Sequence, residues 1–217
     1  MKTLALLIAL AAFLAAPSAS AGSVELPYQI GGAYSVPVAS LKETRYAATI
    51  RQQYDFSCGS AALATLLTHH YKHPVTEDVV FEAMFRNGDQ AKIRIEGFSL
   101  LDMKRYLEAH GFEADGFQEP IEKLAVANMP AIVLINESGY NHFVVVKGLR
   151  DGRVLVGDPA GGTRALTMSA FNAVWTNGVV FVINNRQDRA AFNVARDWQA
   201  APSAPTNAAP STTALPP

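Results

Sequence analysis

Apolar residues follow one another almost without a break after Cys58, in the segment CGSAALATLL. Because a helix that is apolar on all sides is buried at the centre of its domain, this segment predicts a central helix. We expect it to run from Cys58 to about Tyr71, ahead of Pro74. Start and stop signals predict further helices over residues 76–85, 99–110 and 120–127. In the second of these, Ser99 and Asp102 have the spacing of a capping box.

Runs rich in β-branched and aromatic residues lie mainly in the second half of the chain and predict strands. These runs cover residues 112–117, 131–136, 142–149, 153–157 and 179–184. Since the helices come first and the strands later, we expect an α+β domain over residues 46–186, with N-terminal helices packed on an antiparallel sheet.

The segments on either side of this domain have a different character. Residues 22–45 form an N-terminal extension with one strand expected near residues 34–38. Residues 187–217 are rich in alanine and proline towards their end, so we expect a disordered tail.

The first residues show the three parts of a secretory signal peptide. Lys2 precedes an apolar run from Leu4 to Ala16, and small residues follow up to Ala21. We therefore expect cleavage between Ala21 and Gly22, and a mature protein that is periplasmic or secreted. The apolar run is short for a membrane span and no later stretch approaches about 18 apolar residues, so we expect no span in the mature chain.

The charge balance excludes some classes of partner. The chain has 18 Lys+Arg against 19 Asp+Glu, a formal charge of −1, and loss of Lys2 with the signal peptide makes it one unit more negative. This balance gives no electrostatic reason to expect nucleic acid or an anionic membrane surface.

The chain contains one cysteine, which cannot form an internal disulfide. Cys58 is therefore a buried thiol, one half of an intermolecular disulfide, or a working nucleophile. In an oxidising compartment a free thiol is lost to oxidation unless it is shielded or used.

Cys58 stands at the predicted start of the central helix, where unpaired N–H groups and the helix dipole favour a thiolate. A cysteine nucleophile also needs a base. The three histidines of the segment HHYKH lie at the far end of the same helix, about 16 Å or more away at 1.5 Å per residue. His110 is explained by a helix end. His142, at the opening of an apolar strand, is the remaining candidate.

Asp158 ends the next predicted strand and is the natural partner to orient His142. The turn between the two strands decides whether they share a face. With a two-residue turn, Asp158 would point to the face away from His142. With a three-residue turn at residues 150–152, Asp158 would fall opposite Val144, which shares a face with His142. A Cys-His-Asp site therefore predicts the three-residue turn.

An acyl-transfer site also needs hydrogen-bond donors for the developing oxyanion. The backbone N–H of Cys58 is one candidate, and the side-chain amides of Gln52 and Gln53 both qualify by chemistry. Simpler explanations remain open: a packed thiol at Cys58, a strand-edge histidine at His142 and an Asp-Pro turn at Asp158. A glutamine at the surface needs no further role.

Taken together, these residues resemble the C39 cysteine peptidases, papain-like domains that remove double-glycine leaders from bacteriocin-type peptides. The family motif has a glutamine six residues before a Cys-Gly pair, with His and Asp-Pro downstream. The residues that match it are Gln52, Cys58-Gly59, His142 and Asp158-Pro159. The resemblance implies a papain-like fold, and it makes Gln52 rather than Gln53 the oxyanion donor. Ser57 departs from the family, in which an acidic residue often precedes the cysteine.

The resemblance extends to free-standing, exported C39-like proteins, including those associated with functional-amyloid export systems. It implies a cysteine peptidase that cleaves a peptide bond after Gly-Gly by a Cys-His-Asp mechanism. The implied partner is a peptide or protein substrate, such as an amyloid or bacteriocin-like export component. Two alternatives stay open: a catalytically silent, peptidase-like binding or chaperone module for an exported partner, and transfer of the acyl group to an amine instead of water.

We expect no cofactor and no metal. His69 and His73 share a helical face, as metal ligands would, but no acidic residue is spaced to complete a site.

Overall fold

The computed structural model of the protein describes residues 23–25, 35–37 and 40–201. The chain divides into two units, and the boundary along the sequence falls between Ser40 and Leu41. In the first unit, β1 (Ser23–Glu25) and β2 (Ser35–Pro37) pair antiparallel, and β2 coincides with the strand expected near residues 34–38. The predicted signal peptide and the last residues of the predicted tail lie outside the described residues.

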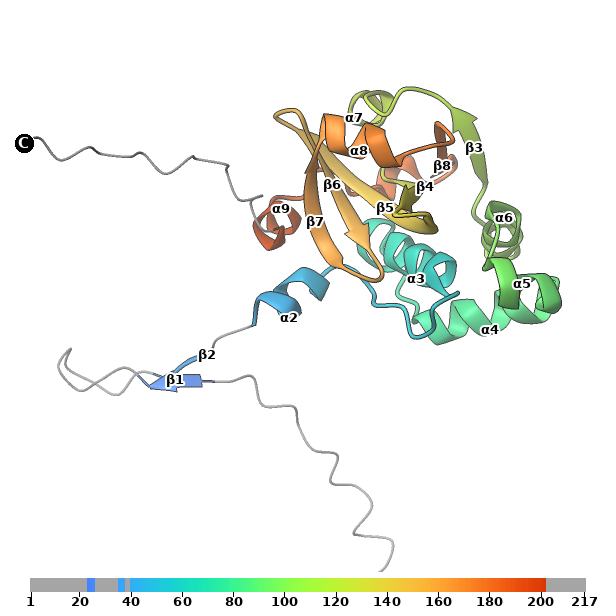
Figure 1. Cartoon of the computed structure of the whole chain (residues 1–217), viewed down its shortest axis with the longest axis horizontal. Coiled ribbons are helices and arrows are strands. Elements are labelled where there is room, and N and C mark those ends of the chain that lie inside the picture. Colours follow the sequence, from blue (N-terminus) through green and yellow to red (C-terminus); the bar gives the residue numbers. More distant parts are fainter. Residues whose placement is uncertain (1–22, 26–34, 38–39, 202–217) are drawn as a thin grey trace, which may run out of the picture. The chain divides into compact units, whose positions relative to one another are not determined.

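In the second unit, the described strands form a six-stranded antiparallel sheet in the order β3-β8-β4-β5-β6-β7 (Figure 1). The strands are β3 (Ala114–Gln118), β4 (Ala131–Glu137), β5 (Tyr140–Arg150), β6 (Arg153–Asp158), β7 (Gly162–Thr167) and β8 (Val179–Ile183). All the strands predicted for the domain are confirmed, with ends that differ by at most two residues. The prediction missed β7, whose segment GTRALT has little alternation and begins at the second residue of a Gly-Gly pair, a pattern typical of a loop.

Apolar side chains cover both faces of this sheet. Ile132 and Val145 point to one face and pack with the central helix α3 (Cys58–Thr65). Their strand neighbours Val133 and Val144 point to the other face. That face is covered by α7 (Lys123–Ala127) and α8 (Met168–Val174) (Figure 1). The expected α+β arrangement is therefore confirmed, with a helix layer on each side of the sheet.

The central helix is buried along its whole length, as its all-apolar sequence predicts. It continues as a π-helical turn, η2 (Leu66–His70), and ends near the expected Tyr71. Beside it lie α4 (Glu77–Asn87) and α6 (Leu100–Ala109), and α5 (Gln90–Glu96) packs against α4. The capping box of α6 is confirmed: Ser99 Oγ accepts from Asp102 N at 3.2 Å, and Asp102 Oδ2 accepts from Ser99 N at 2.8 Å. The short helix α5 was not predicted.

Structure continues well past the predicted end of the domain. Residues 187–201, assigned from the sequence to the disordered tail, contain η3 (Gln187–Arg189) and α9 (Ala195–Ala200). Asp197 and Trp198 of α9 are buried, so this segment is ordered by docking rather than by its own helix propensity. At the other end of the unit, α2 (Leu41–Tyr46) precedes the site. Among the described residues, no helix has both the length and the apolar character to cross a membrane.

Candidate active site

Cys58 is the first residue of α3, and its position is fixed by close packing. Its side chain is 6% exposed. A Cβ at the next residue, Gly59, would lie 2.9 Å from Met103 Cε and 3.0 Å from Phe98 Cβ, so the helix start packs closely against these two side chains. Ser57 Oγ donates to the carboxylate of Glu77 on α4, which ties the helix start in place. The thiol is thus held rigidly at a helix N-terminus.

The imidazole of His142 and the carboxylate of Asp158 meet in a buried hydrogen bond. Nε2 of His142 lies 2.7 Å from Oδ1 of Asp158, and the two residues are 5% and 4% exposed. The carboxylate is held from behind: Oδ1 also accepts from the N–H groups of Ala160 at 2.8 Å and Gly161 at 3.1 Å. Its Oδ2 lies 3.1 Å from Nη2 of Arg164. Asp158 is therefore preorganised to orient the imidazole.

The second ring nitrogen of His142 faces the thiol. Nδ1 is buried and has no hydrogen bond of normal geometry within residues 40–201. Burial by itself would lower the pKa of His142, but hydrogen bonding and charge from Asp158 and from Cys58 outweigh it and raise this pKa to about 9. The imidazole is therefore protonated at neutral pH when it lies between these two partners.

The pKa of Asp158 is shifted in the opposite direction from that of His142. Burial would raise the pKa of Asp158, yet the hydrogen bond and charge of His142, with help from the Ala160 N–H and Arg164, lower it. The structure thus favours an ionised carboxylate beside an imidazolium.

The predicted three-residue turn between β5 and β6 is wrong, although the contact it was meant to explain is present. Arg150 pairs with Arg153, so the turn consists of two residues, and both have positive φ: 52° for Asp151 and 68° for Gly152. The pairing then slips by one residue between Val146 and Gly148. This β-bulge supplies the extra residue that the turn lacks, and it turns Asp158 to the face of His142.

The side chain of Gln52 turns into its own loop. Nε2 donates to the carbonyl oxygens of Tyr54 at 3.0 Å and Asp55 at 3.5 Å, while Oε1 is buried without a partner in the described part of the chain. The backbone N–H of Gln52 donates to Pro159 O at 3.1 Å, which joins this loop to the end of β6. The neighbouring Gln53 points elsewhere and donates to Asp78 at 2.7 Å.

Cys58 opens into a cleft between the end of α5 and the start of β5. Two adjoining hollows of about 490 Å³ and 250 Å³ make up this cleft, and both are lined by Cys58, Gly97, Tyr140 and Asn141. Tyr140 Oη donates to Asp55 O at 2.5 Å across one side. Gly97, Tyr140 and Asn141 are not among the site residues predicted from the sequence. The last two could have been found, because they immediately precede His142 on the same strand.

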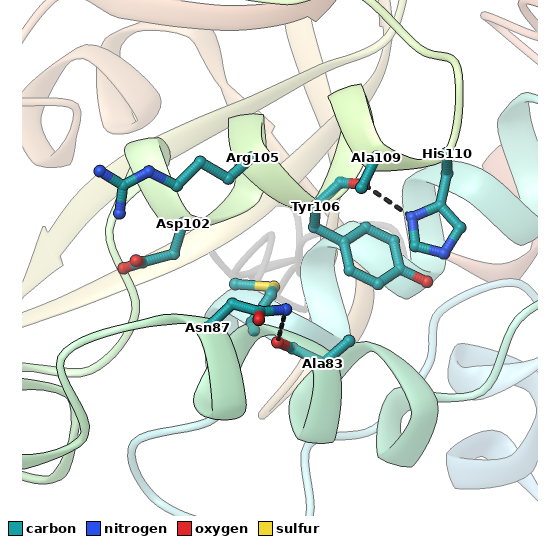
Figure 2. Close-up of a pocket in the computed structure, with 8 residues that line it drawn as sticks. Ala83, Asn87, Asp102, Arg105, Tyr106, Ala109 and His110 are labelled. Carbon is teal, nitrogen blue, oxygen red and sulfur yellow. Dashed lines mark hydrogen bonds between the residues drawn. The ribbon is translucent and has the colours of Figure 1, made fainter.

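A separate hollow of about 300 Å³ lies between α4 and α6, and the four predicted site residues are not among those that line it (Figure 2). His110 borders it and uses Nδ1 to hydrogen-bond Tyr106 O at 2.7 Å, the helix-end role expected from the sequence.

Two histidines of HHYKH, His70 and His73, make structural contacts. His70 is buried, with Nδ1 2.7 Å from Ala191 O, and burial together with the charge of Lys147 lowers its pKa to about 4. His73 packs edge-on against Phe112. In the described ranges, no three His, Cys, Asp or Glu side chains are grouped as metal ligands would be.

Comparison with known proteins adds to this geometry. The model of the peptidase C39 family matches residues 47–188. The probable functional amyloid protease FapD of Pseudomonas aeruginosa is 41% identical over 190 residues, which cover 87% of this chain and 83% of that protein.

Two solved structures share the fold. A double glycine motif protease from an AMS/PCAT transporter, solved with its leader peptide, is 28% identical with a TM-score of 0.51, over 62% of this chain and 89% of that one. The peptidase domain of Streptococcus ComA is 20% identical with a TM-score of 0.53, over 63% of this chain and 96% of that domain. The papain-like fold implied by the sequence motif is therefore confirmed.

Proposed function

The chain belongs to the peptidase C39 family and is a cysteine peptidase, and from this premise we propose that Cys58 is its nucleophile. The observation that carries the proposal is the buried 2.7 Å hydrogen bond from His142 Nε2 to Asp158, which leaves Nδ1 to the thiol. A His held in this way can take the proton of Cys58 and keep it as an imidazolium.

The steps follow from these positions. The Cys58 thiolate attacks the peptide carbonyl, and the oxyanion is held by donors at the start of α3. His142 then gives its proton to the leaving amine, which departs and leaves a thioester on Cys58. The neutral imidazole next takes a proton from water, which attacks the thioester and releases the acid. Asp158 keeps the ring in place throughout and stabilises its charged form.

Gln52 is proposed as the side-chain donor of the oxyanion hole. Its amide nitrogen carries two hydrogens, so one can stay on Tyr54 O while the other leaves its long 3.5 Å contact with Asp55 O and serves the substrate. We expect Gln52→Ala to lower kcat by about 100- to 1,000-fold with little change in KM, because the donor acts only when the charge develops. Steady-state kinetics checks this, with Gln53→Ala as the matched control. Equal rates in the two variants would remove Gln52 from the mechanism.

For the substrate, we propose an exported or secretion-system peptide cut after a Gly-Gly pair. The support is the likeness to a double glycine motif protease and to a probable functional amyloid protease. The cleft adds a physical reason, because Cys58 lines it together with Gly97 and Tyr140. Glycines in the substrate have no side chain, so they let the peptide backbone come close to Cys58. A periplasmic or secreted location, from the predicted signal peptide, belongs to the same proposal.

The substrate proposal is tested with two peptides that differ only at this pair. We expect the Gly-Gly peptide to be cleaved with a kcat/KM about 10- to 100-fold higher than its Ala-Ala counterpart, since each added methyl group must fit beside Cys58. Chromatography of the products, with mass measurement of the fragments, gives both the rate and the cut position. Binding of the Gly-Gly peptide without turnover would instead favour the silent binding module.

A further inference from the structure

Lys147 is a charged residue in the middle of the apolar strand β5, and it is 0% exposed. Its ammonium group lies 2.8 Å from Asp197 Oδ2 and donates to Ala48 O at 2.8 Å and Thr163 Oγ1 at 3.4 Å. Asp197 comes from α9 and is 3% exposed. A buried ion pair of this kind is costly to form, so it calls for a role beyond stability.

Lys147 is also the residue at which β5 bulges. Val146 pairs with Val156 and Gly148 pairs with Leu155, which leaves Lys147 unpaired in the ladder. This one-residue slip turns Asp158 to the face of His142 despite the two-residue turn. The alignment of the proposed catalytic pair therefore depends on the bulge.

The stem of Lys147 also contacts the strand that carries Asp158. A Cβ at Gly157 would lie 2.9 Å from Lys147 Cδ and 2.9 Å from Thr49 Oγ1, so the lysine stem lies directly over this glycine. Gly157 immediately precedes Asp158. A movement of Lys147 would therefore displace Gly157, the residue next to Asp158.

The C-terminal segment, residues 187–201, contacts the bulge and the turn that follows it. Asn193 N donates to Lys147 O at 2.9 Å, which satisfies a backbone carbonyl at the bulge. The Trp198 ring lies 4.6 Å from the guanidinium of Arg150 and 5.5 Å from that of Arg153, at the two ends of the turn. The family match ends at residue 188, before the C-terminal residues that make these contacts. Those residues lie in and just before α9, which is drawn in red in Figure 1.

We propose that the Lys147–Asp197 ion pair is a positioning device that fixes the β5 bulge and through it aligns Asp158 with His142. It rests on the proposed function, in which those two residues act together. Asp197 is a positioning residue and does not touch the reacting atoms. Burial lowers the pKa of Lys147 and Asp197 opposes this effect, so removal of the carboxylate leaves a buried ammonium group that must lose its proton or move.

The test compares Asp197→Asn with Asp188→Asn, a matched change at an exposed acid of the same C-terminal segment. Two quantities are measured at a temperature where circular dichroism shows each variant folded: kcat on the Gly-Gly peptide, and the titration midpoint of the His142 imidazole by nuclear magnetic resonance. We expect Asp197→Asn to lower kcat about 10- to 100-fold and to lower the His142 midpoint by one pH unit or more, while Asp188→Asn changes neither. Asp197→Glu, which keeps the carboxylate, should recover part of the lost kcat and part of the shift in the His142 midpoint.

The His142 readout distinguishes positioning from a direct charge effect, because the charges that shift its pKa are those of Asp158 and Cys58. A folded Asp197→Asn variant with a wild-type His142 midpoint and wild-type kcat would overturn the proposal. If that variant does not fold, Trp198→Ala decides: it keeps both charges and loosens α9, and a lowered His142 midpoint supports the device while an unchanged one overturns it. Absence of turnover in the wild type would instead count against the proposed function, and the titration would still report on the bulge.

Discussion

Replacement of Cys58 by alanine is expected to lower kcat for peptide cleavage by about 10⁴-fold or more, because it removes the nucleophile and with it the thioester route. Cys58 is the one cysteine in the chain, so no second thiol can take over. Product formation from a Gly-Gly peptide, followed by chromatography over long incubations, measures the remaining rate.

The same variant should keep its fold and its affinity for the substrate peptide. Cys58 is a small, buried residue at the start of a helix in which half of the eight residues are alanine or leucine, so alanine can replace it without strain. Unchanged thermal unfolding and unchanged peptide binding therefore serve as controls. Wild-type turnover that survives Cys58→Ala would show that another group carries the reaction.

Replacement of Asp158 by asparagine is expected to lower kcat by about 100- to 10,000-fold and to change its dependence on pH. In the wild type, activity should decline as the pH rises through about 9, where His142 loses its proton. Without the carboxylate, the contribution of Asp158 to the raised His142 pKa is lost while that of Cys58 remains, so this decline should move to lower pH. The pH profile of kcat/KM for both proteins measures the shift.

The raised pKa of His142 also determines how the stability of the fold changes with pH. The pKa of His142 is raised above its ordinary value of 6.5, so the stabilisation it contributes is complete below about pH 6.5 and is lost as the pH rises through about 9. Asp158→Asn should weaken this dependence and move the loss to lower pH, because only the contribution of Cys58 to the raised pKa remains. Glu137→Gln is the matched control, since Glu137 binds the same Arg164 at 2.6 Å without contacting His142. An identical alkaline decline in Asp158→Asn and wild type would contradict the assignment.

The parts of the fold that follow from local patterns could be predicted from the sequence. The all-apolar run after Cys58 gave the buried helix, and Ser99 with Asp102 gave the capping box, because both depend on residues close in the chain. In contrast, α9 and its surroundings were assigned to a disordered tail. Their order comes from Trp198 and Asp197 meeting β5, and no pattern within residues 187–201 reports that docking.

The candidate site shows the same division. The sequence brought His142 and Asp158 together, and the structure places them in contact, but through a two-residue turn and a bulge rather than the predicted three-residue turn. A bulge is set by tertiary contacts, and its local signal was weak: one lysine followed by glycine, Lys147-Gly148, after a run of valines. Of the residues that line the cleft, Gly97 was missed because it lies far from Cys58 and His142 in the sequence.

The most direct test of the account is the rate at which iodoacetamide alkylates Cys58 at pH 6, measured by intact mass in the wild type and in His142→Ala. Since the chain has one cysteine, every adduct reports on this thiol. The account predicts that the wild type reacts at least about tenfold faster, because the imidazolium held by Asp158 stabilises the thiolate. Equal rates in the two proteins would contradict it, because they would show a thiol that His142 does not activate.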